Sequence, residues 1–132
     1  MKLSIILFFL PWMLRTQSLM YKKFRERLKE KNLIVQMKVA DDSIGRFYTF
    51  RDGKIISKRG IHSDPNVCII FKTEKIGFDL LMPPVNYQTR IDAIKNFNLM
   101  MEGPDELTSW FSETVMMSQT NHWEYGTPVE NG

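Results

Sequence analysis

The chain has 132 residues, 43% of them hydrophobic and 25% charged. This length suits one domain, not two, and a domain of this size needs no disulfide or metal to hold its core together. The net charge of +3 is uneven, because residues 1–31 hold eight basic and two acidic residues, a net +6, which leaves −3 for the rest. We expect this N-terminus to contact an anionic membrane or protein surface and no nucleic acid, since Tyr21 and Phe24 are the only aromatic residues in its basic stretch, 15–31.

The single cysteine, Cys68, excludes an intrachain disulfide and fits a reducing compartment. It lies in the apolar run 67–71, where we expect a buried hydrophobic side chain and not a nucleophile. We therefore predict a cytoplasmic protein, peripheral at the membrane if residues 1–31 bind there.

The N-terminal segment 1–31 combines an apolar run at 3–14 with a basic amphipathic helix that continues to Lys31. Pro11 is expected to break the helix. The run is too short to span a bilayer and has only Lys2 before it. Three interpretations stay open: a packed helix with an apolar leader, an interfacial anchor, and a cleaved signal peptide.

Strands dominate the next part of the chain. In residues 33–39 every second side chain from Leu33 is apolar, with Ile34, Gln36 and Lys38 between them, which indicates a half-exposed antiparallel strand. Strands at 44–51 and 54–58 are joined by Asp52-Gly53, a strong hairpin signal. Together they predict a three-stranded meander. The strand at 67–72 is apolar on both faces, which indicates an internal position in the sheet.

The second half of the chain is predicted to contain helices around a last strand. Thr73 is the expected N-cap of the first helix, and Ile91 and Ile94 are expected to face inward from the second. The last helix follows Pro104 with apolar residues at spacings of three and four. The predicted elements are a helix that begins at 74 and is stopped by Pro83-Pro84, a helix over 87–95, a strand over 96–101 and a helix from 105 that ends near 119.

These elements predict an α+β fold with a five-stranded, mostly antiparallel sheet covered on one side by helices. The domain is expected to occupy residues 32–119, between the N-terminal segment 1–31 and a polar tail, 120–132. We see no repeat and no low-complexity segment.

No catalytic or metal-binding pattern is visible. His62 is expected in a turn and His122 in the tail, and neither has a partner at metal-ligand spacing. Nucleophile, phosphate-binding and dinucleotide-binding motifs are also missing from the sequence. We therefore predict a protein that is not an enzyme and needs no metal or cofactor.

Apolar residues stand out instead, with nine Met and nine Phe in the chain. They gather at 80–85, 99–101, 110–111 and 115–117. Methionine lines adaptable binding surfaces as well as cores. A sheet covered by such helices can enclose an apolar tunnel or close into a filled core, and both arrangements use the same residue types.

The order of short motifs from Tyr48 to Met117 resembles the sterol carrier protein type 2 domain family. The features that carry the likeness are a strand ending in Asp52-Gly53-Lys54, a turn with Asp64-Pro65 before an apolar strand, and a helical stretch, strand and glycine over 91–103. The resemblance implies a five-stranded sheet, a hydrophobic tunnel, and non-catalytic binding and transport of a fatty acid, fatty acyl-CoA or sterol.

Carried over by position, the resemblance implies a tunnel lined from the middle helix, the last strand and the last helix. The sequence departs from the family at 102–105, where a lysine- and glycine-rich turn is usual, and at Pro83-Pro84. Both lie near the expected tunnel mouth. The residues expected to line the tunnel are Phe78, Leu81, Met82, Leu99, Met101, Trp110, Phe111, Thr114 and Met117.

The tail also resembles the start of a molybdopterin-dependent oxidoreductase, at residues 123–127 and 131–132. This likeness implies a partner enzyme and an alternative function. In that alternative the chain is a docking module with a filled core, which binds a membrane surface or a partner oxidoreductase through residues 1–31.

Overall fold

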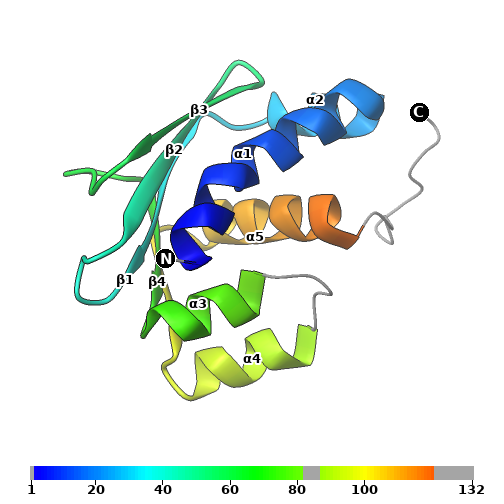
Figure 1. Ribbon diagram of the computed structural model, residues 1–132. Coiled ribbons are helices and arrows are strands. Elements are labelled where there is room, and N and C mark those ends of the chain that lie inside the picture. The colour runs from blue at the N-terminus through cyan, green and yellow to red at the C-terminus, as the bar shows by residue number, and fades with distance from the viewer. Residues whose placement is uncertain (1, 82–86, 121–132) are drawn as a thin grey trace.

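The computed structural model describes residues 2–81 and 87–120, with the side chains of 87, 90 and 116–120 excepted (Figure 1). Its elements, in chain order, are α1 (Lys2–Met20), α2 (Lys22–Leu28), β1 (Leu33–Val39), β2 (Gly45–Arg51), β3 (Lys54–Arg59), β4 (Val67–Phe71), α3 (Glu74–Leu81), α4 (Tyr87–Lys95), β5 (Leu99–Glu102) and α5 (Asp105–Thr120).

The five strands form one sheet in the order β3-β2-β1-β4-β5. Only β1 and β4 run parallel, and the three other pairs are antiparallel. The predicted meander is confirmed, and its hairpin turn places Asp52 and Gly53 at φ angles of 53° and 81°. The strand β4 lies between β1 and β5, which agrees with its apolar sequence. The predicted fold class is confirmed.

All five helices lie on one side of the sheet (Figure 1). Alternate strand residues point to this covered side, which we call the inner face, and the others to the open face. Val35 pairs with Tyr48 on one side and with Val67 on the other, and all three side chains are buried. The core therefore fills the space between the inner face and the helices.

The helix α1 continues through Pro11, so the expected break there is wrong. The chain leaves the helical conformation only at Tyr21, where φ is −125° and ψ is 117°. Proline has no N–H to donate to the carbonyl four residues earlier, which here is the Leu7 oxygen. The buried Tyr48 hydroxyl donates to that oxygen instead, at 2.8 Å. The sheet thus satisfies the carbonyl that the proline leaves without a donor.

The strand predicted at 96–101 begins only at Leu99. Before it, Phe97 adopts a φ of 60° and is 75% exposed. The Phe97 amide donates to the Ile94 carbonyl and the Asn98 amide to the Ala93 carbonyl. These two bonds form a Schellman motif, which ends α4 with a phenylalanine where glycine is usual. Within α4, Ile94 is 44% exposed and Ala93 is buried, so the expectation that Ile94 faces inward is wrong.

Candidate functional site

The candidate site is the apolar layer between the inner face of the sheet and the helices. Strands and helices both contribute buried side chains to it, and nearly all of them are apolar. An interior of this kind interacts with any guest molecule by excluding water, not by hydrogen bonding. The buried apolar side chains are Val35, Met37, Phe50, Val67, Ile69, Phe71 and Leu99 from the strands, Leu3, Leu7, Leu10 and Leu14 from α1, and Leu80, Leu81, Trp110, Phe111 and Val115 from α3 and α5.

Two of the expected lining residues meet on one aromatic ring of the sheet. The rings of Trp110 and Phe111 lie 5.6 and 5.9 Å from the Phe50 ring, both edge-on. Edge-to-face contacts between aromatic rings stabilise such a cluster beyond the area it buries. The structure therefore brings Trp110 and Phe111 together in the interior, as the helical spacing predicts.

Trp110 and Thr114 also join α5 to α2 through polar contacts. The fully buried Thr114 hydroxyl donates to the Trp110 carbonyl at 2.7 Å and accepts from the Arg27 Nε at 2.8 Å. The Arg27 guanidinium lies 5.5 Å from the Trp110 ring, whose Nε1 donates to Glu30 at 3.2 Å. We call these four residues the α2–α5 clasp. The clasp explains how the polar Thr114 can be buried. Its hydrogen bonds satisfy the side-chain polar atoms of Trp110 and Thr114, which are two of the expected lining residues.

The β5 residues Leu99 and Met101 lie on the inner face but differ in exposure. Leu99 is opposite Phe71 in the register and only 6% exposed. Met101 is opposite the buried Ile69 but is itself 38% exposed, and the Ser112 hydroxyl lies 3.6 Å from its sulfur. The interior thus reaches solvent at Met101, between β5 and α5.

The expected residues of α3 are split between the interior and its edge. Leu81 is buried, whereas Phe78 is half-buried and has the Lys2 ammonium 5.5 Å from its ring centroid. Phe78 therefore lies beside the start of α1. Met82 lies outside the described residues. Met117 lies in α5, but its side chain is not among those described, so its role stays a prediction.

In the structure α1 packs against the domain, which is one of the three interpretations left open for segment 1–31, but none of its residues was among those expected to line the interior. Leu3, Leu7, Leu10 and Leu14 are all at most 2% exposed. Their spacing of four, three and four residues was the available signal, because it places them on one face of a helix. Apolar residues on the opposite side of the same helix concealed that pattern.

The remaining chemical groups have structural roles. Burial raises the pKa of the half-buried Cys68 thiol on the open face, which lowers its reactivity at neutral pH. His62 lies in a turn, where its Nδ1 accepts from the Asp64 amide at 2.9 Å. Within residues 2–81 and 87–120, no three His, Cys, Asp or Glu side chains gather as metal ligands do. His122 lies outside the described residues.

Comparison with known proteins identifies the fold. No family model matches the chain, and no curated protein matches it. Among solved structures, the apo form of sterol carrier protein 2 from Yarrowia lipolytica is 16% identical over 89% of this chain and 92% of its own, with a TM-score of 0.59. A UbiJ-SCP2 ubiquinone synthesis protein is 16% identical over 80% of this chain and 76% of its own, with a TM-score of 0.51.

A third structure is a double mutant of the sec-alkyl sulfatase PisA1, with 14% identity and a TM-score of 0.50. The likeness covers 67% of this chain but only 14% of the sulfatase. The fold therefore occurs alone and as one part of a longer enzyme. These identities are low, and what they establish is the fold: the chain has a domain like that of sterol carrier protein 2, as its motifs predict.

Proposed function

We propose that this chain, which has the sterol carrier protein 2 fold, binds a lipid-like molecule without catalysis. The observation that carries the proposal is the structural match over most of both chains to a sterol carrier protein. The candidate ligands are a fatty acid, a fatty acyl-CoA and a sterol, which share a long or broad apolar part.

The chemistry of the interior supports binding by desolvation. Each Å² of apolar area that a ligand removes from water contributes on the order of 25 cal/mol. The buried polar side chain among the expected lining residues, Thr114, has its hydroxyl occupied within the α2–α5 clasp. The interior offers apolar contacts to a guest and leaves the headgroup to the edge of the domain.

The half-exposed Met101 supports an entry point between β5 and α5. It shares the inner face with buried Leu99 and Ile69, so apolar surface is continuous from solvent to the interior at this place. A ligand chain that enters here passes the Met101 sulfur and then the Leu99 side chain. We infer that α5 shifts to admit the chain, because α5 and β5 form the two sides of this entry.

Two adjacent methionines provide a matched test of the entry point. Met100 and Met101 are 44% and 38% exposed, but they point to opposite faces of the sheet. We expect Met101→Asp to weaken uptake of a fluorescent fatty acid by about tenfold or more, because an apolar chain then passes a carboxylate. Met100→Asp is the control and should bind as the unaltered chain does.

The readouts are a fluorescence titration and the melting temperature, with each ligand class in its own titration. Equal binding by the two aspartate variants, with equal melting temperatures, would overturn the entry point. Failure of all three ligand classes to bind the unaltered, folded chain would overturn the proposed function itself.

A further inference from the structure

The outer side of α1 is an apolar surface that the fold leaves uncovered. Ile5, Phe9 and Trp12 are 56%, 56% and 58% exposed. At about 100° per residue, the exposed residues of α1 fall within an arc of roughly 140°, in which Lys2, Arg15 and Thr16 are the polar side chains. We call this the outer face of α1, and its apolar residues are Ile5, Phe8, Phe9, Trp12, Leu19 and Met20.

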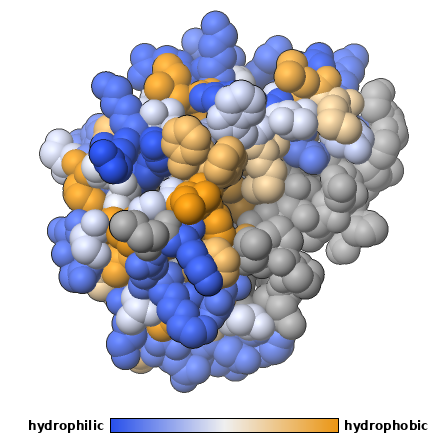
Figure 2. Space-filling view, in the orientation of Figure 1, coloured by the Kyte–Doolittle hydropathy of each residue, from blue (hydrophilic) through white to orange (hydrophobic). Residues whose placement is uncertain are grey.

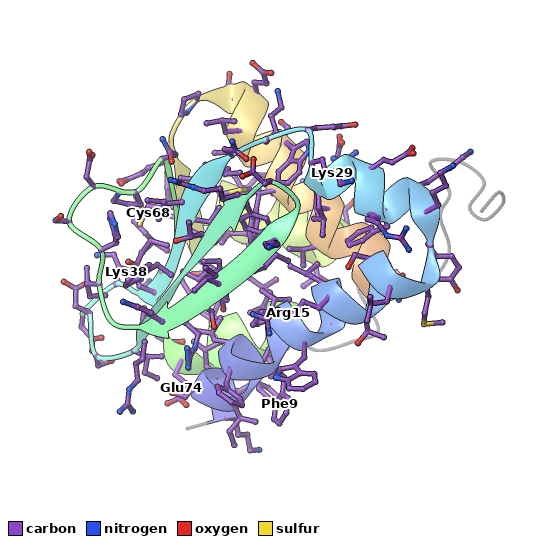
Figure 3. All side chains as sticks on the ribbon, turned by 90° about the horizontal axis from the view of Figure 1, so that it is seen from above. Phe9, Arg15, Lys29, Lys38, Cys68 and Glu74 are labelled. Carbon is purple, nitrogen blue, oxygen red and sulfur yellow. The ribbon has the colours of Figure 1, made fainter. Side chains whose placement is uncertain are left out.

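The packing of α1 does not require these side chains. Its leucines fill the interior from the opposite side of the helix, and Arg15 points to β3, where its guanidinium donates to the Ile55 carbonyl (Figure 3). Phe9 points away from the domain in the same view. Figure 2 shows apolar side chains gathered along α1 on this side of the molecule. A contiguous exposed apolar surface of this kind marks an interaction site.

Cations lie at both ends of the outer face. Near the start of α1, the Arg46 guanidinium lies 5.1 Å from the Phe8 ring, and Lys2 is exposed beside Phe78. At the other end, the Arg25 guanidinium donates to the carbonyls of Ser18 and Leu19 at 2.9 and 3.3 Å. These bonds hold a positive charge next to the last apolar residues of the face.

The helix α1 itself carries no acidic side chain. Residues 2–20 contain no Asp or Glu, and at the start of the helix Glu74 accepts from the Leu3 amide at 3.4 Å. The exposed Lys22, two residues after the end of α1, is the first residue of α2. An apolar strip with a tryptophan in it and cations at its ends complements a bilayer that carries negative headgroups.

We propose that the outer face of α1 is a docking surface for an anionic lipid bilayer. The helix lies along the interface, with Phe9 and Trp12 among the acyl chains and with Arg25, Lys22 and Arg46 near the phosphates. This surface lies on the side of α1 opposite the interior, so the proposal goes beyond the ligand site and does not depend on it.

The contacts of α1 favour a helix that lies on the bilayer over one that crosses it. Among the described residues, α1 is the one helix that is long and apolar enough to span a membrane. If α1 crossed the bilayer, its buried leucines would leave the interior. The hydrogen bonds from Tyr48 to the Leu7 carbonyl and from Arg15 to the Ile55 carbonyl would also be lost. Docking through the outer face keeps all of these contacts.

Flotation of the full chain with vesicles tests the proposal. The vesicles consist of phosphatidylcholine alone or of phosphatidylcholine mixed with phosphatidylglycerol, and each is tested at low and at high salt. The test variant is the double substitution Phe9→Gln with Trp12→Gln. The control is Ile56→Gln, since Ile56 is 59% exposed but lies on the open face of the sheet. Sedimentation velocity without vesicles reports the oligomeric state.

We expect the unaltered chain and the Ile56 control to float with the mixed vesicles, and the double variant to bind at least about tenfold more weakly. Binding should weaken at high salt and with phosphatidylcholine alone. Three results would each overturn the proposal: equal flotation of the double variant and the control, equal binding to neutral vesicles, and a dimer that the double variant abolishes while no vesicle binds. The last result would assign the face to a second copy of the chain.

Discussion

The hydrogen bond between Tyr48 and the Leu7 carbonyl gives a sharp prediction about how α1 is held. The Tyr48 side chain is fully buried, and its hydroxyl donates at 2.8 Å to an oxygen that Pro11 cannot serve. Tyr48→Phe removes that donor and leaves the carbonyl unsatisfied. A buried polar group without a partner costs about 1–3 kcal/mol, and we expect a loss of that size in the free energy of unfolding.

The substitution Pro11→Ala isolates the cause of this loss. Alanine restores an N–H at position 11, which can donate to the Leu7 carbonyl as in an ordinary helix. In that background Tyr48→Phe should cost about 1 kcal/mol less than in the unaltered chain. The difference between the two costs is independent of the small cavity that the missing proline ring leaves, because that cavity is present in both members of the pair.

Urea unfolding followed by circular dichroism measures the unaltered chain and the three variants of this cycle. Far-ultraviolet spectra taken before unfolding check that each variant keeps its helices. An equal cost of Tyr48→Phe in both backgrounds would refute the reasoning, because the tyrosine would then contribute by packing alone and not by serving the carbonyl.

Three further predictions concern single residues. Gly103→Ala should destabilise the domain by about 1–3 kcal/mol in urea unfolding, because Gly103 has a φ of 128° and an added Cβ would lie 2.5 Å from the Asn66 carbonyl oxygen; an unchanged midpoint would contradict this. Gln36→Leu should lower the free energy of unfolding by about 1–3 kcal/mol. The buried Gln36 side chain accepts from the His62 backbone amide at 2.6 Å and donates to the Gly60 carbonyl at 3.0 Å. An unchanged free energy of unfolding in the variant would show that these bonds contribute nothing. Cys68 should react with iodoacetamide more slowly than a free thiol at neutral pH, because burial raises the pKa of Cys68 and the thiolate is the reactive form. Its reactivity should rise only as the pH exceeds the ordinary thiol pKa. Mass spectrometry after timed alkylation measures the labelling rate, and rapid labelling at neutral pH would contradict the prediction.

Local sequence signals predict most of the sheet. The strand over 33–39 places an apolar side chain at every second position, Asp52-Gly53 supplies the positive φ angles that the hairpin between β2 and β3 requires, and the structure places both as expected. Thr73 caps α3 as predicted, since its hydroxyl oxygen accepts from the Ile76 amide at 3.2 Å. Each of these features depends on residues close together in the chain, where period and turn chemistry are reliable guides.

The errors arise where distant residues decide the local structure. Pro11 is tolerated within a helix because Tyr48, far away in the sequence, serves the carbonyl that it leaves. Phe97 takes a positive φ to close α4, although its place in an alternating apolar run is typical of a strand. In both cases tertiary contacts or a helix end override the local pattern.

The candidate site was predictable in part. Trp110 and Phe111 face the interior because helical spacing places them there, and Leu99 follows from alternation in its strand. The polar contacts of Thr114 with Arg27 were not predictable, since no local pattern joins α5 to α2. The exposure of Met101 depends on how far α5 extends over β5, which is a property of the assembled domain.

The central claim is that the interior accepts an apolar ligand, and native mass spectrometry of the gently purified chain tests it most directly. Any bound molecule is extracted and identified, and the apo chain is then offered a fatty acid, an acyl-CoA and a sterol. We predict a bound lipid or uptake of one class, with a melting temperature raised by about 5–10 °C at a ligand concentration of about a hundred times Kd. The double variant at Phe9 and Trp12 should keep this uptake, which separates the interior from the outer face of α1. A folded chain that carries no lipid and takes up none of the three classes would contradict the account.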